Sequence, residues 1–316
     1  YMDIMNRGGG IINTMKATRE ASEAELADHA MDHLKKMLAM GVTTVEAKSG
    51  YGQDYDTEIK QLHVTRKLNA SQPIELVSTF LGAHAVPPEY KGRSKAFLDF
   101  LLKEVMPVVK KENLAEFCDI FCEEGVFSVD ESRQYLKKAR EMGFKLKIHA
   151  DEIVSLGGSE LAGELKATSA DHLLHASDAG IKAMAENGVV STLLPTTAFC
   201  LREPFARARE MIDAGCAVAL ATDFNPGSGF TFSVPLMLGL AVIYMHMTAE
   251  EAITALTLNG AAAVGRADRI GSIEVGKQAD LTILQYPSYK FLPYHTGVNI
   301  VEKVIKKGEL VHTASV

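Results

Sequence analysis

The chain has 316 residues, of which 47% are hydrophobic and 23% charged, as in an ordinary soluble globular protein. Its net charge of −7 disfavours nucleic acid or an anionic membrane surface as a partner, and no apolar run is long enough to predict a membrane-spanning helix. The four cysteines are few for this length and favour a reducing, cytoplasmic location. We interpret Cys118 and Cys122 as buried thiols of a core strand, since no second cysteine pair completes a zinc site.

Strand-like and helix-like segments alternate along most of the chain. The expected strands span 42–49, 74–84, 117–124, 145–150, 167–175, 189–195 and 217–223. The expected helices span 22–40, 56–70, 92–112, 130–142, 157–165, 178–187 and 203–214, and the expected caps include Ser22, Asp130 and Ser177. Repeated strand–helix units of this kind predict parallel strands joined by right-handed crossovers.

The seven expected strands are one short of a closed (β/α)8 barrel. The opening YMDIMNRGGGI reads like the middle of a longer chain, so we expect the first strand to precede it. A long loop and a helical region to about residue 265 follow the last strand, with Thr248 and Glu251 as a predicted capping box. We therefore predict an α/β fold, with a (β/α)8 TIM-type barrel over 1–268 and part of a small β-sandwich domain over 269–316.

Side chains that can do chemistry gather where the expected strands end, which is where such barrels place their active sites. They are Lys48, Tyr51, His84, Glu123, Glu124, His149, Asp151, Glu152, Asp171, His172, His175, Asp223, Asn225 and Ser228. Each has a structural explanation of its own: a lone strand-end histidine usually packs, and Asp223 before Asn-Pro-Gly can form a turn. Histidines and an aspartate at the same edge of four different strands are harder to explain by packing alone.

The segment KLKIHADEI, 145–153, points to a metal. A neutral imidazole nitrogen of His149 can bind a divalent ion at about 2.0–2.2 Å, and Asp223 can give a carboxylate to the same ion. Glu152 lies three residues beyond His149 and is available to face a substrate. Two ligands are too few for a hydrolytic metal site, so we expect the others on the missing first strand.

Together, HADEI, SADHLL and TDFNPGS resemble the amidohydrolase superfamily, and within it the imidazolonepropionase family. KSGYG, FLGAHAVP, GGSELAGEL and LPTTAF are similar to motifs of that family in the same order, and GSIEVGKQADLTIL resembles its return into a β-sandwich. The resemblance covers essentially the whole chain. This family carries a His-x-His pair on its first barrel strand, and the absence of that pair here fits a start downstream of it.

The resemblance implies a barrel of the metal-dependent amidohydrolase type that binds one divalent metal, zinc or iron. It implies the following residues: the metal ligands His149 and Asp223, the catalytic residues Glu152, His172 and Asp223, and the substrate-binding residues Tyr51, His84, Glu152, Asn225, Gly227 and Ser228, with Tyr1 near the pocket. The implied reaction is hydrolysis of the ring amide of 4-imidazolone-5-propanoate, a small molecule, to N-formimidoyl-L-glutamate in histidine degradation. The implied assembly is a homodimer.

Two other interpretations stay open at this point. One is another amidohydrolase, such as a nucleobase or amino-imidazole deaminase, which would share the barrel and its metal-binding edge. The other is a catalytically dead barrel that only binds ligand or partners, which the missing His-x-His pair favours and the retained His149, Glu152, His172 and Asp223 oppose.

Overall fold

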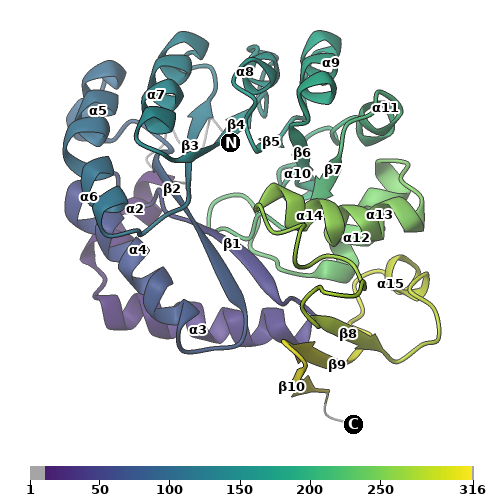
Figure 1. Ribbon diagram of the computed structural model, residues 1–316. Coiled ribbons are helices and arrows are strands. Elements are labelled where there is room, and N and C mark those ends of the chain that lie inside the picture. Colours follow the sequence, from purple (N-terminus) through teal and green to yellow (C-terminus); the bar gives the residue numbers. More distant parts are fainter. Residues whose placement is uncertain (1–10, 315–316) are drawn as a thin grey trace.

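Seven parallel strands form one curved sheet in which the spatial order follows the order along the chain. Figure 1 shows this arrangement in a computed structural model, which describes residues 11–314. The strands are β1 (Thr44–Lys48), β2 (Glu75–Ala83), β3 (Phe117–Cys122), β4 (Lys145–Ala150), β5 (Ser169–His172), β6 (Val190–Leu193) and β7 (Val218–Leu220). The predicted (β/α) barrel architecture is confirmed for these strands, because each pairs in parallel with the next.

Helices connect successive strands and cover the outer face of the sheet (Figure 1). Those around the first seven strands are α2 (Ile11–Glu20), α3 (Glu23–Ala39), α4 (Tyr55–Asn69), α5 (Ser94–Phe100), α6 (Met106–Lys111), α7 (Val129–Glu141), α8 (Gly158–Glu164), α9 (Asp178–Asn187), α10 (Pro195–Leu201) and α11 (Ala208–Asp213). A π-helical stretch, Leu101–Val105, joins α5 to α6, and a short 3₁₀ turn spans Pro88–Tyr90.

Helix starts follow the capping chemistry of the sequence, with one correction. The expected caps Ser22 and Ser177 each accept a backbone hydrogen bond from the first turn of their helix. The expectation for Asp130 is wrong, because α7 begins at Val129 and its cap is Ser128, two residues before Asp130. Ser128 and Glu131 form a reciprocal capping box, which satisfies two backbone donors where Asp130 would satisfy one.

Several expected elements have other boundaries in the structure, among them the strand expected over 217–223, which spans Val218–Leu220, and the helix expected over 92–112, which is divided into α5, the π-helical stretch and α6. The strand expected over 167–175 ends at His172, because His172 and Leu173 both adopt positive φ and turn the chain away from the sheet. The strand expected over 189–195 ends at Leu193, because Pro195 occupies the first turn of α10. The helix expected over 203–214 is confined to α11.

The main core lies between the sheet and its outer helices. Large side chains such as Phe80, Phe97 and Tyr135 are buried there, and burying a side chain of this size stabilises the fold by about 1.5–3 kcal/mol. Cys118 and Cys122 of β3 are buried in the same cluster, which confirms their interpretation as core thiols. Side chains on the outer face of the sheet therefore pack against the helices, whereas the concave face can carry polar side chains.

The remaining chain forms helices and a second, smaller sheet. The helices are α12 (Val234–Tyr244), α13 (Ala249–Leu256), α14 (Leu258–Ala263) and α15 (Phe291–Tyr294), and the sheet contains β8 (Leu281–Leu284), β9 (Val301–Lys306) and β10 (Glu309–Thr313). These strands pair in an antiparallel manner, in the order β10, β9, β8. Lys306 Nζ ties this sheet to the start of β1 by hydrogen bonds to Asp280 Oδ2 (2.7 Å) and the Thr43 carbonyl (2.9 Å).

Side chains also link the two edges of the parallel sheet. His33 of α3, the helix before β1, contacts Phe224, Phe230 and Phe232 of the loop after β7, with ring centroids 4.8, 5.7 and 6.0 Å apart. The loop after the last strand is therefore held against α3, the helix that precedes the first strand. None of the helices described here is long and apolar enough to cross a membrane.

Candidate functional site

Charged side chains from four strands meet on the concave face of the sheet. They are Glu46 and Lys48 of β1, Asp119 of β3, Lys147 and His149 of β4, and Asp171 of β5. On β1 and β4 the two charged residues are two positions apart, which places both on the same face of the strand. The concave face therefore carries a layered network of charges where an ordinary barrel interior is apolar.

Lys48 is the cation at the centre of this network. Its Nζ lies 2.6 Å from Asp119 Oδ2 and 2.8 Å from Asp171 Oδ2. Burial alone would lower the pKa of Lys48, but the adjacent carboxylates outweigh it and hold the pKa well above its ordinary value. A deeper layer pairs Lys147 with Glu46 at 2.9 Å.

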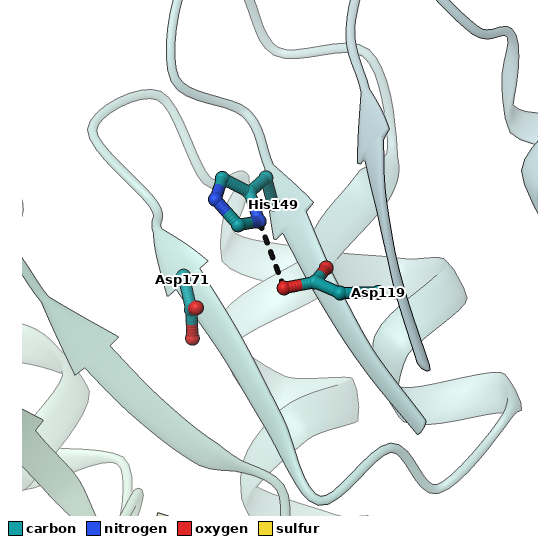
Figure 2. Close-up of side chains that lie close together, drawn as sticks. All are labelled: Asp119, His149 and Asp171. Atoms are coloured by element: carbon teal, nitrogen blue, oxygen red, sulfur yellow. Dashed lines mark ion pairs between the residues drawn. The ribbon is translucent and has the colours of Figure 1, made fainter. Parts of the chain in front are cut away.

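Asp119 connects this network to His149. The Asp119 Oδ2 atom lies 3.1 Å from Nδ1 of His149, an ionic contact in which the ring N–H is not aimed at the oxygen well enough for a regular hydrogen bond. Burial would lower the pKa of His149, but the Asp119 carboxylate outweighs it and raises that pKa. The other ring nitrogen, Nε2, lies on the side of the ring away from Asp119 (Figure 2). Asp119 thus holds one edge of the imidazole and leaves the opposite edge to the site.

The same residues form a cluster of metal-ligand type. One ligand atom each from Asp119, His149 and Asp171 lies within 4.8 Å of the others, and all three residues are buried (Figure 2). Asp223, the expected second ligand, is not part of this group. The Lys48 ammonium already lies against both carboxylates of the cluster. The Nε2 atom of His149, which lies away from Asp119, is therefore the ligand atom of the cluster best placed for an added cation.

A second pair of groups lies beside His149: Glu152 of the loop after β4 and His172 at the end of β5. Glu152 Oε1 lies 3.4 Å from Nδ1 of His172, and the rings of His172 and His149 are 5.2 Å apart. Burial raises the pKa of Glu152 to about 8, helped by the Asp223 carboxylate. Burial and the nearby His149 charge hold the pKa of His172 well below its usual value. Near neutral pH the pair is therefore a protonated carboxyl group beside a neutral imidazole.

Tyr51 and His84 extend this row of rings on the other side of His149. The ring centroids of Tyr51 and His84 are 5.4 Å apart in an edge-on contact, and those of His84 and His149 are 5.8 Å apart. Burial, with a contribution from the His149 charge, lowers the pKa of His84 to about 3. The structure thus brings together five of the residues expected at the site: the rings of Tyr51, His84, His149 and His172, with Glu152 beside His172.

Asp223 lies in the loop after β7 and belongs to the same electrostatic environment. Its Oδ2 accepts a hydrogen bond from Thr197 Oγ1 at 2.7 Å. Burial raises the pKa of Asp223, while Thr197 and the charge of His149 act in the opposite direction. Asn225 stabilises the conformation of the rest of this loop, because its Oδ1 accepts hydrogen bonds from the backbone N–H groups of Gly227 and Ser228, both at 2.8 Å.

Two buried carboxylates hold the backbone of the loop that carries Glu152. Glu123 Oε2 accepts the backbone N–H of Glu152 at 3.0 Å and that of Ile153 at 2.9 Å. Asp151 Oδ1 accepts three more backbone N–H groups, of residues 156–158, at 3.0–3.1 Å. These strand-end acids therefore shape the loop, a role that their position in the sequence does not reveal.

Asp119 and Lys48 are the site residues that sequence analysis missed or did not assign. Asp119 is a single charge inside the otherwise apolar run FCDIFC, and a charge that interrupts a buried strand is the signal that could have identified it. Tyr1, expected near the pocket, lies outside the described residues. Asp171 was recognised only as a strand-end carboxylate.

The donor set fits a divalent metal ion. Within residues 11–314, the buried Nδ1 atoms of His84, His149 and His172 make no regular hydrogen bond, and those of His149 and His172 lie 3.1 and 3.4 Å from the carboxylates of Asp119 and Glu152. Imidazole and carboxylate groups gathered in one place are ligands that zinc and iron accept. The structure therefore supports a divalent cation near His149.

Comparisons with known proteins agree with this geometry. A model of the amidohydrolase family matches residues 1–311. The chain is 66% identical over 315 residues to an imidazolonepropionase of Clostridium tetani, covering 100% of this chain and 75% of that protein. It is 63% identical over 310 residues to one of Parabacteroides distasonis, covering 98% and 74%. An adenosine deaminase from Xanthomonas campestris with bound zinc shares the fold at a TM-score of 0.68 and 20% identity, covering 93% of this chain and 71% of that chain. The chain therefore belongs to the amidohydrolase family, in which it stands among the imidazolonepropionases.

Proposed function

We propose that this protein hydrolyses the ring amide of 4-imidazolone-5-propanoate to N-formimidoyl-L-glutamate, a step of histidine degradation. The observation that carries the proposal is the meeting of Glu152, His172 and His149 on one face of the sheet. This site occurs in a chain that is 66% identical to an imidazolonepropionase over 315 of its own 316 residues. The reaction requires a polarised carbonyl, an activated water and a proton for the leaving nitrogen, and the side chains of this site suit the last two tasks.

The proposed cofactor is one divalent ion, zinc or iron, held by His149 and Asp223. Both metals accept nitrogen and oxygen ligands, so the donor set does not distinguish them. When bound, such an ion would lower the pKa of a water molecule from about 15.7 towards about 7 and polarise the ring carbonyl. Asp119 supports this arrangement from behind, because it holds the Nδ1 edge of His149 and leaves Nε2 facing the site.

The chain's own residues carry the proton transfers in this proposal. Asp223 takes a proton from the attacking water while the oxygen of that water forms a bond to the ring carbonyl carbon. His172 is neutral near pH 7, so it can donate an N–H to the oxygen on which negative charge develops. Glu152 keeps its proton near pH 7 and gives it to the ring nitrogen as the C–N bond breaks. Each such proton-transfer role contributes a factor of about 10²–10⁴ to the rate.

Tyr51 and His84 are proposed to contact the imidazolone ring, since they lie beside His149 in the row of rings. Asn225, Gly227 and Ser228 are proposed to hold the substrate or product from the loop after β7. That loop is fixed by its own hydrogen bonds, which gives it a defined shape before any ligand binds.

Three further proposals concern the whole protein. We place a boundary between a catalytic barrel over 1–268 and part of a small β-sandwich over 269–316. The antiparallel sheet of β8, β9 and β10 supports that division. A homodimer is the proposed assembly, by family resemblance. A cytoplasmic location is supported by the thiol state of the cysteines, all four of which are free.

The test is to incubate the metal-loaded protein with 4-imidazolone-5-propanoate and, separately, with guanine. We expect N-formimidoyl-L-glutamate from the first and no ammonia from the second. Ammonia release from guanine would favour a deaminase instead. Absence of turnover with both substrates, in protein shown to contain metal, would favour a barrel that only binds ligand.

A further inference from the structure

Glu58 lies beneath the loop that carries Tyr51 and is completely buried. It belongs to the first turns of α4, and its carboxylate faces the backbone of the loop after β1. Its Oε1 accepts the N–H groups of Gly52 (2.9 Å) and Gln53 (2.8 Å), and its Oε2 accepts that of Gly50 (3.1 Å). The hydroxyl of Ser49 also hydrogen-bonds to it. A single carboxylate therefore satisfies the backbone donors on both sides of Tyr51.

The shape of this loop requires an internal acceptor for its backbone N–H groups. Gly50 and Gln53 both adopt positive φ, of +110° and +55°, and a β-carbon on Gly52 would lie 2.6 Å from Cβ of Thr57. This backbone turns its N–H groups inwards, where neither a neighbouring strand nor water can accept them. The Glu58 carboxylate supplies several acceptor sites in one place, which is the property the loop needs.

The same loop determines how Tyr51 meets His84. Ser49 Oγ accepts the backbone N–H of Leu81 at 3.1 Å, which anchors the loop to β2 just before His84. Gly50 packs directly on His84, since a β-carbon at residue 50 would lie 3.1 Å from His84 Cβ. The edge-on contact between the Tyr51 and His84 rings, with centroids 5.4 Å apart, follows from these constraints.

We infer that Glu58 is a positioning residue for substrate binding: it folds the loop of residues 49–53 so that Tyr51 stands against His84. The inference rests on the proposed function, in which Tyr51 and His84 contact the imidazolone ring. Glutamine is the informative replacement, because it keeps the length of the side chain. Its amide has one oxygen for these donors and turns an NH₂ group towards the others.

The experiment compares Glu58→Gln with Asp56→Asn, which removes a carboxylate from the exposed side of the same helical turn. In Glu58→Gln we expect the amides of Gly50, Gly52 and Gln53 to exchange with deuterium at least about tenfold faster. We expect KM for 4-imidazolone-5-propanoate to rise about tenfold with kcat changed less than about threefold, as for lost ground-state binding. Metal content stays the same, and Asp56→Asn alters none of these quantities.

A double-mutant cycle separates positioning from general loss of structure. If Glu58 acts through Tyr51, Glu58→Gln raises KM much less in a Tyr51→Ala background than in the wild type. An equal rise in both backgrounds, or unchanged exchange of the three amides, would overturn the inference. If the proposed function is wrong, the wild type shows no turnover of 4-imidazolone-5-propanoate. Amide exchange at Gly50, Gly52 and Gln53 then still tests whether Glu58 holds the loop. If Glu58→Gln does not fold, Glu58→Asp, whose shorter side chain cannot span the same donors, is measured in its place.

Discussion

Replacing Lys48 with methionine would leave two buried carboxylates without their counter-ion. In the wild type, Lys48 Nζ lies 2.6 Å from Asp119 Oδ2 and 2.8 Å from Asp171 Oδ2. The side chains of Asp119 and Asp171 are only 0% and 5% exposed, whereas that of Lys48 is 22% exposed, so the ammonium is the charge that compensates both buried carboxylates. Removing one partner of a buried ion pair costs about 3–5 kcal/mol, and we take about 3 kcal/mol because Asp119 keeps its contact with His149.

This free energy converts into a measurable change in Tm. The entropy of unfolding is about 2.1 cal/mol/K per residue, or about 0.66 kcal/mol/K for 316 residues. A loss of about 3 kcal/mol therefore lowers Tm by about 4–5 °C if the chain unfolds as one unit. Lys182→Met is the matched control, because Lys182 is a 72% exposed lysine whose distance to Glu186 is 3.8 Å. Such a surface pair is worth at most about 1 kcal/mol, so its Tm should change by less than about 1.5 °C.

The decrease in Tm caused by Lys48→Met should depend on pH. Burial would raise the pKa of Asp119, but His149 and Lys48 outweigh it and hold that pKa well below its usual value. A carboxyl group whose pKa is lowered by folding stabilises the fold above its unfolded pKa of about 3.9, and the stabilisation is lost as the pH falls. The Tm difference from the wild type should therefore stay wide from pH 7 down to about pH 4 and should narrow below about pH 4. Equal Tm values near pH 7, or a difference that does not narrow, would refute this reasoning.

Two further substitutions test the proposed roles of individual side chains. Glu152→Gln should keep the metal but slow turnover by about 10²–10⁴-fold. The folded-state pKa of Glu152 is raised to about 8, so the wild type should lose stability as the pH rises from about 4.3, the unfolded pKa, towards that value, and the variant should not. A variant with full kcat would remove Glu152 from the mechanism. Asp119→Asn should weaken zinc binding about 10–100-fold in a chelator competition without unfolding the chain, because it loosens the hold on His149. Unchanged affinity would show that Asp119 does not orient that ligand.

The parallel strands could be predicted from the sequence because each lies in a short segment whose own residue pattern favours a strand. β4 agrees with its expected range of 145–150, and α9 with 178–187. In both segments, apolar period and capping residues favour the same structure as the tertiary packing. The end of β5 was misjudged because the positive φ values of His172 and Leu173 are imposed by their surroundings, which no local pattern encodes.

The strand-end residues of the site were predictable, but the residues that support them were not. His149, Glu152 and His172 stand where barrel strands end, so their position alone marks them. Lys48, by contrast, pairs with carboxylates 71 and 123 residues away. Contacts over such separations depend on the complete fold, and the sequence does not show which charged residues of different strands will meet.

The central claim is that His149 and Asp223 hold one catalytic divalent ion. The most direct test is the metal content of Asp223→Ala, measured on the same samples as turnover of 4-imidazolone-5-propanoate and compared with the wild type. We predict that metal retention and turnover are lost together. Normal metal occupancy in the Asp223→Ala variant would contradict the assignment of Asp223 as a ligand.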